Sequence, residues 1–175
     1  MKKKMFFAGS GGQGALTIGQ MIAKAGMDEG NEVTWLPSYG PEMRGGTANC
    51  TVIISDKRIS CPLINDADVL VAMNLPSLRK FESMVNPGGV IFINSSIVPE
   101  TSSRTDVKVI EIPANEKAAE VGNSRAANFV MLGAILTETG CCQKESVVHQ
   151  IEKMFSGRKA KFLPSNIAAL ELYCK

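Results

Sequence analysis

Short apolar runs alternate along this chain with longer stretches in which apolar residues return every three or four positions. The first pattern predicts buried strands, and the second predicts helices with one face on a core. The runs predict strands at 4–9, 32–37, 47–54, 58–64, 66–73, 90–96 and 107–113. The spaced stretches predict helices at about 12–29, 75–85, 115–121, 125–138, 144–155 and 165–173.

This alternation predicts a single α/β domain over residues 1–175, of Rossmann-like form. Strands joined by helices pair in parallel, so we expect a mostly parallel sheet with helices on both faces. The runs 47–54 and 58–64 are separated by the short turn Ser55-Asp56-Lys57, which predicts a β-hairpin inserted into the sheet. No stretch has the composition of a linker or a repeat.

Composition narrows the function classes. The 175 residues are 45% hydrophobic and 21% charged, with a net charge of +2, which is ordinary for a soluble globular protein. Proteins that bind nucleic acid carry a clustered basic face. A net charge of +2 gives no reason to expect such a face here. No apolar run reaches the ~18–20 residues of a membrane helix, and the start of the chain lacks the features of a signal peptide. We therefore expect a cytoplasmic protein that binds neither nucleic acid nor membrane.

The residues that usually carry metal or acid–base chemistry are sparse. The five cysteines form no C-x-x-C pair, which argues against a disulfide framework and an iron–sulfur cluster. Cys50 and Cys61 lie in strand-like runs and are interpreted as small buried residues. The single histidine, His149, lies in an amphipathic stretch and is interpreted as a surface residue. We expect no metal site and no catalytic residue in this chain.

The stretch GSGGQG at Gly9–Gly14 follows the first predicted strand and opens the first predicted helix. Gly9, Gly11 and Gly14 have the spacing G-x-G-x-x-G of a dinucleotide-binding turn. NAD also requires an acidic residue at the end of the second strand, and the first carboxylate after that strand is Glu42, out in the loop. Three interpretations stay open: a tight packing turn, a site for a phosphate-bearing group other than NAD, or a nicotinamide or flavin site.

A second candidate is the loop YGPEMRGG at Tyr39–Gly46, after the second predicted strand. Ligands of open α/β sheets bind at the carboxyl ends of strands, so both glycine-rich loops should lie along one rim. The loop is either a surface loop with an internal pair between Glu42 and Arg44, or a contact surface for a ligand or a neighbouring subunit.

Two stretches together carry a resemblance to a known family. GSGGQGALTIGQMIAKAG and PSYGPEMRGGTANCTVIIS resemble the gamma subunit of the 2-oxoacid:ferredoxin oxidoreductases, which act on pyruvate, 2-oxoglutarate or branched-chain acids such as ketoisovalerate. The likeness continues through PLINDADVLVAM, NPGGVIFINSS and NSRAANFVMLGAI, so it covers nearly the whole chain. The second stretch looks closer to the 2-oxoglutarate and ketoisovalerate type, and the sequence does not fix the oxoacid.

The resemblance implies a role in oxidative decarboxylation of a 2-oxoacid with coenzyme A, which gives acyl-CoA, carbon dioxide and reduced ferredoxin. It implies alpha and beta subunits that hold thiamine diphosphate and magnesium, and iron–sulfur clusters in beta and in a ferredoxin-like delta subunit. It implies that this chain alone binds none of these cofactors, and that it touches coenzyme A. The residues expected at that contact are Gly9, Ser10, Gly11, Gly12, Gln13, Gly14, Tyr39, Gly40, Glu42, Arg44, Gly45 and Gly46.

Two other functions stay open beside this one: a stand-alone oxidoreductase that binds NAD or a flavin, and a scaffold subunit that binds no ligand. In the subunit interpretation, the isolated chain should be inactive and colourless. Trp35, Tyr39 and Met43 lie in or beside the second loop and predict an exposed apolar patch. We expect the isolated chain to self-associate through it as a symmetric dimer.

Overall fold

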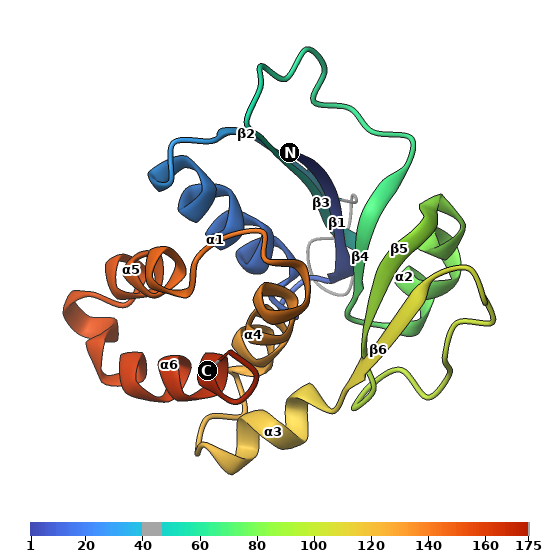
Figure 1. The fold of residues 1–175 in the computed structure, drawn as a ribbon. Helices are drawn as coiled ribbons and strands as arrows, with labels where there is room; N and C mark the ends of the chain where they lie inside the picture. Colours follow the sequence, from blue (N-terminus) through green and yellow to red (C-terminus); the bar gives the residue numbers. More distant parts are fainter. Residues whose placement is uncertain (40–46, 175) are drawn as a thin grey trace.

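A computed structural model of the chain describes residues 1–39 and 47–174. Its six strands form one mixed sheet in the order β2-β3-β1-β4-β5-β6 (Figure 1). All are parallel to one another except β3, which runs antiparallel between β1 and β2. The strands are β1 (Lys2–Ser10), β2 (Glu32–Tyr39), β3 (Thr47–Ser55), β4 (Ala67–Ala72), β5 (Val85–Asn94) and β6 (Lys108–Ile112).

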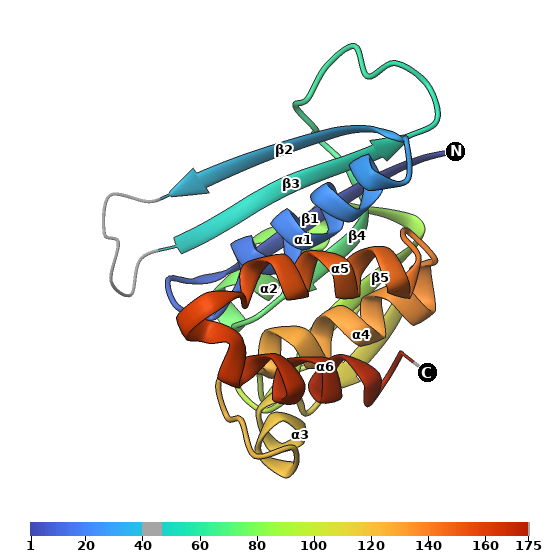
Figure 2. The same ribbon diagram turned by 90° about the vertical axis from the view of Figure 1, so that its left-hand side faces the viewer.

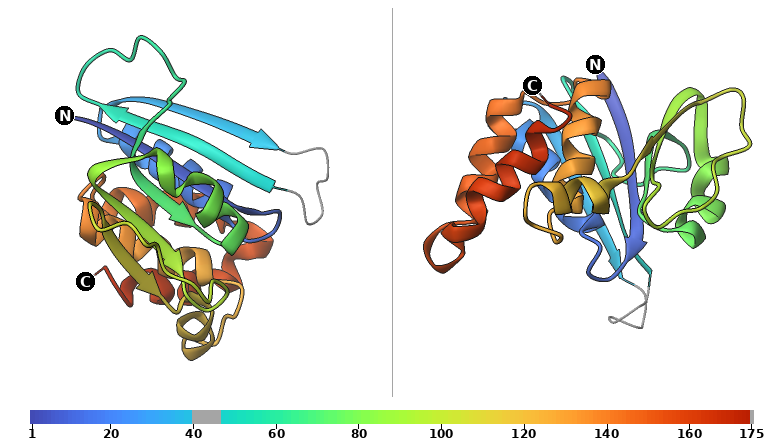
Figure 3. Two further views of the ribbon diagram at one scale, coloured as in Figure 1. Left: turned by 90° about the vertical axis from the view of Figure 1, so that its right-hand side faces the viewer. Right: turned by 90° about the horizontal axis from the view of Figure 1, so that it is seen from below.

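Helices cover both faces of this sheet, as expected (Figures 2 and 3). They are α1 (Ala15–Asp28), α2 (Leu75–Phe81), α3 (Ala114–Glu120), α4 (Ala127–Thr139), α5 (Lys144–Met154) and α6 (Leu163–Glu171), with the 3₁₀ turns η1 (Glu82–Met84) and η2 (Gly157–Phe162). The larger core lies between the sheet and α1, α4, α5 and α6, and a smaller core lies under α2. The expected α/β class is therefore confirmed.

Glycines set the distance between α1 and the sheet. A Cβ at Gly19 would overlap the Cys50 sulfur on β3, and one at Gly26 would lie 3.2 Å from Val33 on β2. The helix ends before Gly30, whose φ of +80° is one that side chains rarely adopt. The sequence GQMIAKAG therefore allows the backbone of α1 to pack closely on β2 and β3.

The expected β-hairpin between 47–54 and 58–64 is wrong. Residues 56–66 contain no strand, and β3 instead pairs with β1 on one side and with β2 on the other. Because both hydrogen-bonding edges of β3 are occupied, the run 58–64 has no edge to join. It forms an irregular loop in which Leu63 is 69% exposed.

Two further features concern the ends of elements and the membrane. The helix expected at 75–85 ends at Phe81, and β5 begins at Val85, which is the last residue of that expected helix and lies before the strand expected at 90–96. Within the described parts of the chain, no helix is long and apolar enough to cross a membrane.

Candidate functional site

The glycine-rich loop lies where β1 ends and α1 begins. Gly12 and Gly14 have φ values of +92° and +83°, so the loop uses two positions that favour glycine. Gly14 is the N-cap of α1, and no side chain caps the helix there. The first backbone N–H groups of α1 therefore have no partner within the helix and can donate to an anion.

The Gln13 side chain fixes the conformation of this loop through hydrogen bonds. Its side-chain oxygen accepts from the Ser10 N–H at 2.7 Å and from the Asn74 amide at 3.2 Å, and the same amide donates to the Ser10 hydroxyl at 2.8 Å. Gly9 lies against this arrangement, since a Cβ there would be 2.8 Å from the Gln13 oxygen and 2.9 Å from Met73. Ser10 and Gln13 thus fix the shape of the loop through contacts inside it.

A cleft of about 440 Å³ opens beside the loop, at the carboxyl ends of β1, β4 and β5. The N-termini of α1 and α4 meet at its wall. Asn128, in the first turn of α4, packs on Gly14 so closely that a Cβ there would lie 2.7 Å from the Cβ of Asn128. The residues that line the cleft are Gly12, Gln13, Gly14, Thr17, Met73, Asn94, Ile97, Asn115, Ser124, Arg125, Ala127 and Asn128.

A buried amide orders the floor of the cleft. Asn94, at the end of β5, is 1% exposed. Its amide donates to the Asn115 side-chain oxygen at 3.0 Å, and its own oxygen accepts from the Ser96 and Ala114 N–H groups at 3.3 Å each. These bonds connect the end of β5 to the start of α3, so the Asn94 side chain has all its partners within the protein.

The charge of the lining favours an anion. Among the described residues of the cleft, Arg125 is the only charged side chain. The rest of the lining combines the apolar side chains of Met73, Ile97 and Ala127 with amides, hydroxyls and the backbone N–H groups of two helix N-termini. A carboxylate would repel a phosphate, and the described lining contains none. The cleft is therefore suited to a phosphate or a carboxylate ligand.

The structure places part of the predicted site here. Gly12, Gln13 and Gly14 line the cleft, Gly11 is exposed beside it, and Gly9 is buried below. Tyr39 ends β2, while Gly40, Glu42, Arg44, Gly45 and Gly46 lie outside the described residues. The ends of the second loop do lie at the expected rim, because Tyr39 pairs with Ala48 and Thr47 pairs with Ser10.

Several lining residues were not predicted: Thr17, Asn94, Asn115, Ser124, Arg125 and Asn128. One signal pointed to Asn94, because it ends a central parallel strand, where ligands of such sheets bind. The position of Asn128 depends on how α4 packs against α1, and no local pattern in the sequence encodes that contact.

The cysteines and the histidine differ in their exposure to solvent. Cys50 is buried as expected, and burial raises the pKa of its thiol to about 12, so it stays protonated. Cys61 was expected to be buried and is exposed, because its segment is a loop rather than a strand. His149 is exposed on α5. The described residues contain no group of three or more metal-ligating side chains.

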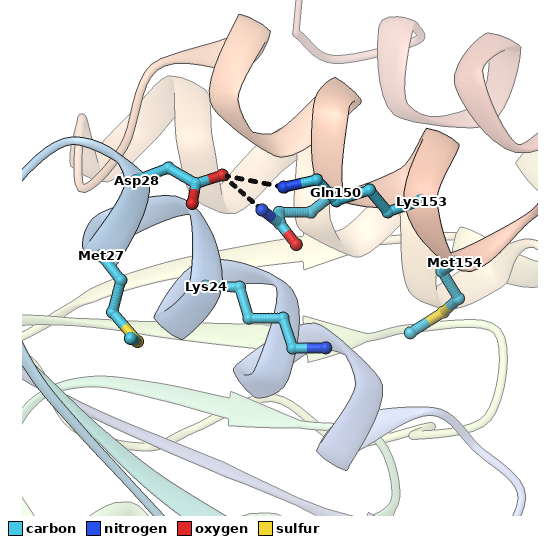
Figure 4. A pocket seen from close by; sticks show the side chains of 6 residues that line it. All are labelled: Lys24, Met27, Asp28, Gln150, Lys153 and Met154. Carbon is cyan, nitrogen blue, oxygen red and sulfur yellow. Dashed lines mark hydrogen bonds and ion pairs between the residues drawn. The ribbon is translucent and has the colours of Figure 1, made fainter.

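A second cleft lies between α1 and α5, and its polar side chains bond to one another (Figure 4). The Asp28 carboxylate on α1 accepts a hydrogen bond from the Gln150 amide and forms an ion pair of 3.7 Å with Lys153, both on α5. The polar groups at this position therefore join the two helices.

Comparison with known proteins adds to this geometry. The family model described as pyruvate ferredoxin/flavodoxin oxidoreductase matches residues 4–173. The ketoisovalerate oxidoreductase subunit VorA of Methanothermobacter marburgensis is 42% identical over 166 residues, which are 94% of this chain and 34% of VorA. The 2-oxoglutarate synthase subunit KorC of Methanocaldococcus jannaschii is 33% identical over 150 residues, which are 84% of this chain and 80% of KorC. The chain thus spans about a third of the length of VorA.

Solved structures share the fold. The gamma subunit of the keto/oxoacid ferredoxin oxidoreductase from Geobacter sulfurreducens has a TM-score of 0.81 at 28% identity, over 97% of this chain and 95% of that subunit. The 2-oxoglutarate:ferredoxin oxidoreductase from Magnetococcus marinus was solved with 2-oxoglutarate, coenzyme A and succinyl-CoA bound. It has a TM-score of 0.89 at 24% identity, over 98% of this chain and 30% of that chain, which shows a common fold.

Proposed function

Because the chain belongs to the pyruvate ferredoxin/flavodoxin oxidoreductase family, we propose that it is the gamma subunit of a 2-oxoacid:ferredoxin oxidoreductase. The observation that carries the proposal is the match over residues 4–173, together with similarity to KorC over 80% of that subunit's length. The complex would oxidise and decarboxylate a 2-oxoacid of the 2-oxoglutarate or branched-chain type. Similarity to both VorA and KorC agrees with these two substrate classes.

In this proposal the chemistry of the oxoacid takes place in other subunits. Alpha and beta subunits would bind thiamine diphosphate and magnesium, and beta and delta subunits would hold the iron–sulfur clusters that reduce ferredoxin.

The contribution of this chain would be a contact with coenzyme A. The glycine-rich loop Gly9–Gly14 would present backbone N–H groups, and the loop Tyr39–Gly46, with Glu42 and Arg44, would contribute from across the rim. Coenzyme A carries a pyrophosphate and a further phosphate, so a cleft that has hydrogen-bond donors and Arg125 in its lining, with no carboxylate among its described residues, supports the proposal. The coenzyme A in the related 2-oxoglutarate enzyme agrees with it.

Reconstitution with the partner subunits tests this function. The chain should co-purify with alpha and beta subunits from its native host, and the reconstituted complex should form acyl-CoA and reduce ferredoxin only when this chain is present. The isolated chain should have no activity and no visible chromophore. Full activity of the complex without this chain, or an absorbance band with matching iron or flavin in the isolated chain, would contradict the proposal.

A scaffold function without a ligand is the second candidate. The close contacts of Gly9 and Gly14 give both glycines a packing role, which this candidate also requires. The two functions differ in one measurement: titration of the assembled complex with coenzyme A should be unaffected by changes in the glycine-rich loop if the chain is only a scaffold.

A further inference from the structure

The turn between α4 and α5 carries two adjacent cysteines, Cys141 and Cys142. They follow Gly140, which ends α4 with a φ of +56°. Both side chains are buried in the larger core, and both thiols are free. The proposed function gives this pair no role, although adjacent thiols have a chemistry that a single buried cysteine lacks.

The two thiols of this pair are in contact and are not equivalent. The Cys142 thiol lies 3.5 Å from the carbonyl oxygen of Ile22 on α1 and within hydrogen-bond reach of the Cys141 sulfur. Its hydrogen bond to an ionised Cys141 lowers the pKa of that residue against the effect of burial, and it raises the pKa of Cys142. Cys141 is therefore the thiol of the pair that ionises first.

The surroundings of Cys141 also favour a thiolate. Its backbone N–H donates to the Thr139 hydroxyl at 3.3 Å. The Lys3 ammonium donates to the Thr139 carbonyl oxygen and so places a positive charge near the pair. A thiolate beside a neutral thiol is the arrangement that two-electron oxidants convert to a disulfide, because the first sulfur attacks the oxidant and the second resolves the product.

We propose that Cys141 and Cys142 are an oxidation site at which hydrogen peroxide converts the two thiols into a vicinal disulfide. The Cys141 thiolate attacks one peroxide oxygen and the O–O bond breaks. The departing hydroxide takes up the proton that Cys141 released, which gives water and a sulfenic acid. The Cys142 sulfur then attacks the Cys141 sulfur, and the hydroxyl leaves as a second water with the Cys142 thiol proton. The sulfur pair loses two electrons and the peroxide gains them.

Burial of the pair determines which oxidant fits and what the oxidation changes. Only a small oxidant reaches a buried sulfur, which favours peroxide over a bulky disulfide. Adjacent Cα atoms are about 3.8 Å apart, closer than is usual for a disulfide, so added thiol should reduce the product readily. Oxidation also removes the Cys142 donor to Ile22 on α1, the helix that begins at the glycine-rich loop.

The experiment uses the full-length chain with Cys61→Ser, because the exposed Cys61 thiol would react independently. The folded protein is treated with hydrogen peroxide at pH 7, the remaining thiols are alkylated, and peptides are mapped by mass spectrometry. We expect the peptide with both cysteines to lack alkylation and to have lost a pair of hydrogen atoms. Dithiothreitol should restore both alkylation sites.

Three further substitutions in the same background assign the roles. Cys142→Ser should stop the reaction at a sulfenic acid on Cys141, which dimedone traps. Cys141→Ser should slow oxidation at Cys142 roughly tenfold or more, because a thiol of raised pKa carries little thiolate at pH 7. Cys174→Ser is the matched control, since Cys174 lies in the same core and is 8% exposed, as Cys142 is, and it should leave the product unchanged. Circular dichroism checks that each variant is folded.

Three results would overturn the oxidation site. Both cysteines could remain open to alkylation after peroxide treatment, a disulfide could join either of them to Cys174, or sulfinic acid could accumulate on Cys141 without a disulfide. The peptide map of the protein that carries only Cys61→Ser decides among these results, so the test stands even if one of the further variants fails to fold. None of the measurements involves coenzyme A or a partner subunit, so their outcome is independent of the proposed function.

Discussion

At the scale of single residues, Gly14 has two separate reasons to be glycine. Its φ of +83° is unfavourable for a side chain, and its hydrogen atoms leave the space into which Asn128 packs. Gly12 shares the first reason but not the second, because nothing lies within 4 Å of the position of its Cβ. A side chain at Gly12 would therefore meet only an unfavourable backbone conformation, whereas one at Gly14 would also overlap Asn128.

We expect Gly12→Ala to lower the free energy of unfolding by about 1–2 kcal/mol, the cost of placing a side chain at positive φ. Gly14→Ala should lose a further 1–3 kcal/mol or so, because the Asn128 side chain must move. Urea denaturation of both variants measures the difference. An equal decrease in the free energy of unfolding of the two variants would mean that α4 moves away at little cost and that Asn128 does not fix the start of α1.

Arg44 is a residue whose role only the assembled complex can reveal. A guanidinium in a glycine-rich loop can take a phosphate or a carboxylate through two parallel hydrogen bonds. If it contacts coenzyme A, Arg44→Ala should raise the coenzyme A requirement of the complex about ten- to a hundredfold and leave the dependence on the oxoacid unchanged. Steady-state titration of each substrate tests this.

The alternative for Arg44 is a contact between subunits or an ion pair with Glu42. A contact between subunits predicts that the variant complex dissociates on a sizing column, while the fraction that stays intact keeps its normal coenzyme A dependence. An intact complex with unchanged dependence on coenzyme A would remove Arg44 from the ligand site.

At the scale of elements, a polar cluster ties β1, β4 and β5 together at the end of the sheet opposite the cleft. Asp66, just before β4, accepts from the Lys4 ammonium at 2.6 Å and from the Asn86 amide at 2.8 Å. Asp68 accepts from the Lys4 N–H at 2.8 Å and from Asn86 at 3.1 Å. The hydrogen bond from Lys4, followed by that from Asn86, holds the pKa of Asp66 below its ordinary value.

This shift predicts a dependence of stability on pH. A carboxylate whose pKa is lower in the folded state stabilises the fold above its unfolded pKa of about 3.9. The stabilisation is lost as the pH falls through the lower native pKa. Asp66→Asn should therefore be less stable than the wild type at pH 7, and the difference should vanish below the native pKa. Urea unfolding at several pH values measures it, and Glu111→Gln, an exposed carboxylate on β6, is the control. A constant difference at all pH values would show that the amide disturbs packing rather than charge.

The contact between α4 and α6 depends on a glycine in the middle of a helix. A Cβ at Gly133 would overlap the carbonyl oxygen of Leu170, whereas one at Gly26 in α1 would meet only side-chain atoms, at 3.2 Å or more. Alanine in a helix gains about 1 kcal/mol over glycine, and overpacking costs about 1–3 kcal/mol or more.

We therefore expect Gly133→Ala to destabilise the protein, because a backbone oxygen cannot turn away as a side chain can. Gly26→Ala should be close to neutral, since the flexible ends of Val33 and Ile54 can move by a few tenths of an ångström. Thermal unfolding followed by circular dichroism compares the two variants. A stabilised Gly133→Ala would show that α6 shifts along α4 at little cost.

The elements themselves were largely predictable, and their arrangement was not. Apolar periodicity located the α-helices and the strands of the described residues, because burial of one face determines that pattern. It missed the 3₁₀ turn η2 and the first residues of β5, and it predicted a strand at 58–64 that does not form. The position of β3 between β1 and β2 depends on pairing between strands that are distant in the sequence, so the hairpin was placed wrongly. The glycine-rich loop was found because backbone conformation selects glycine locally. Asn128 was missed because its position depends on tertiary packing.

At the scale of the whole molecule, the sheet ends on one side at β2, whose outer edge has no strand partner among the described residues. Trp35, one of the three residues expected to form an apolar patch, is half-buried on the α1 side. The side chain of Tyr39 and all of Met43 lie outside the described residues, so the patch stays a prediction. Leu36, on the opposite face of β2, is 40% exposed. An unpaired edge strand beside apolar side chains is a common site of association.

We expect the isolated chain to form a two-fold symmetric dimer through β2, because no partner subunit then covers that edge. In a two-fold interface a new charge faces its own copy, so Leu36→Lys should shift the protein toward monomer. Leu63→Lys places the same charge on the loop 56–66, where the side chain is 69% exposed, and should leave the association unchanged. Sedimentation velocity over a range of protein concentrations measures all three proteins. A wild type that stays monomeric at high concentration would contradict the dimer, and a dimer of unchanged strength in Leu36→Lys would exclude β2 as its interface.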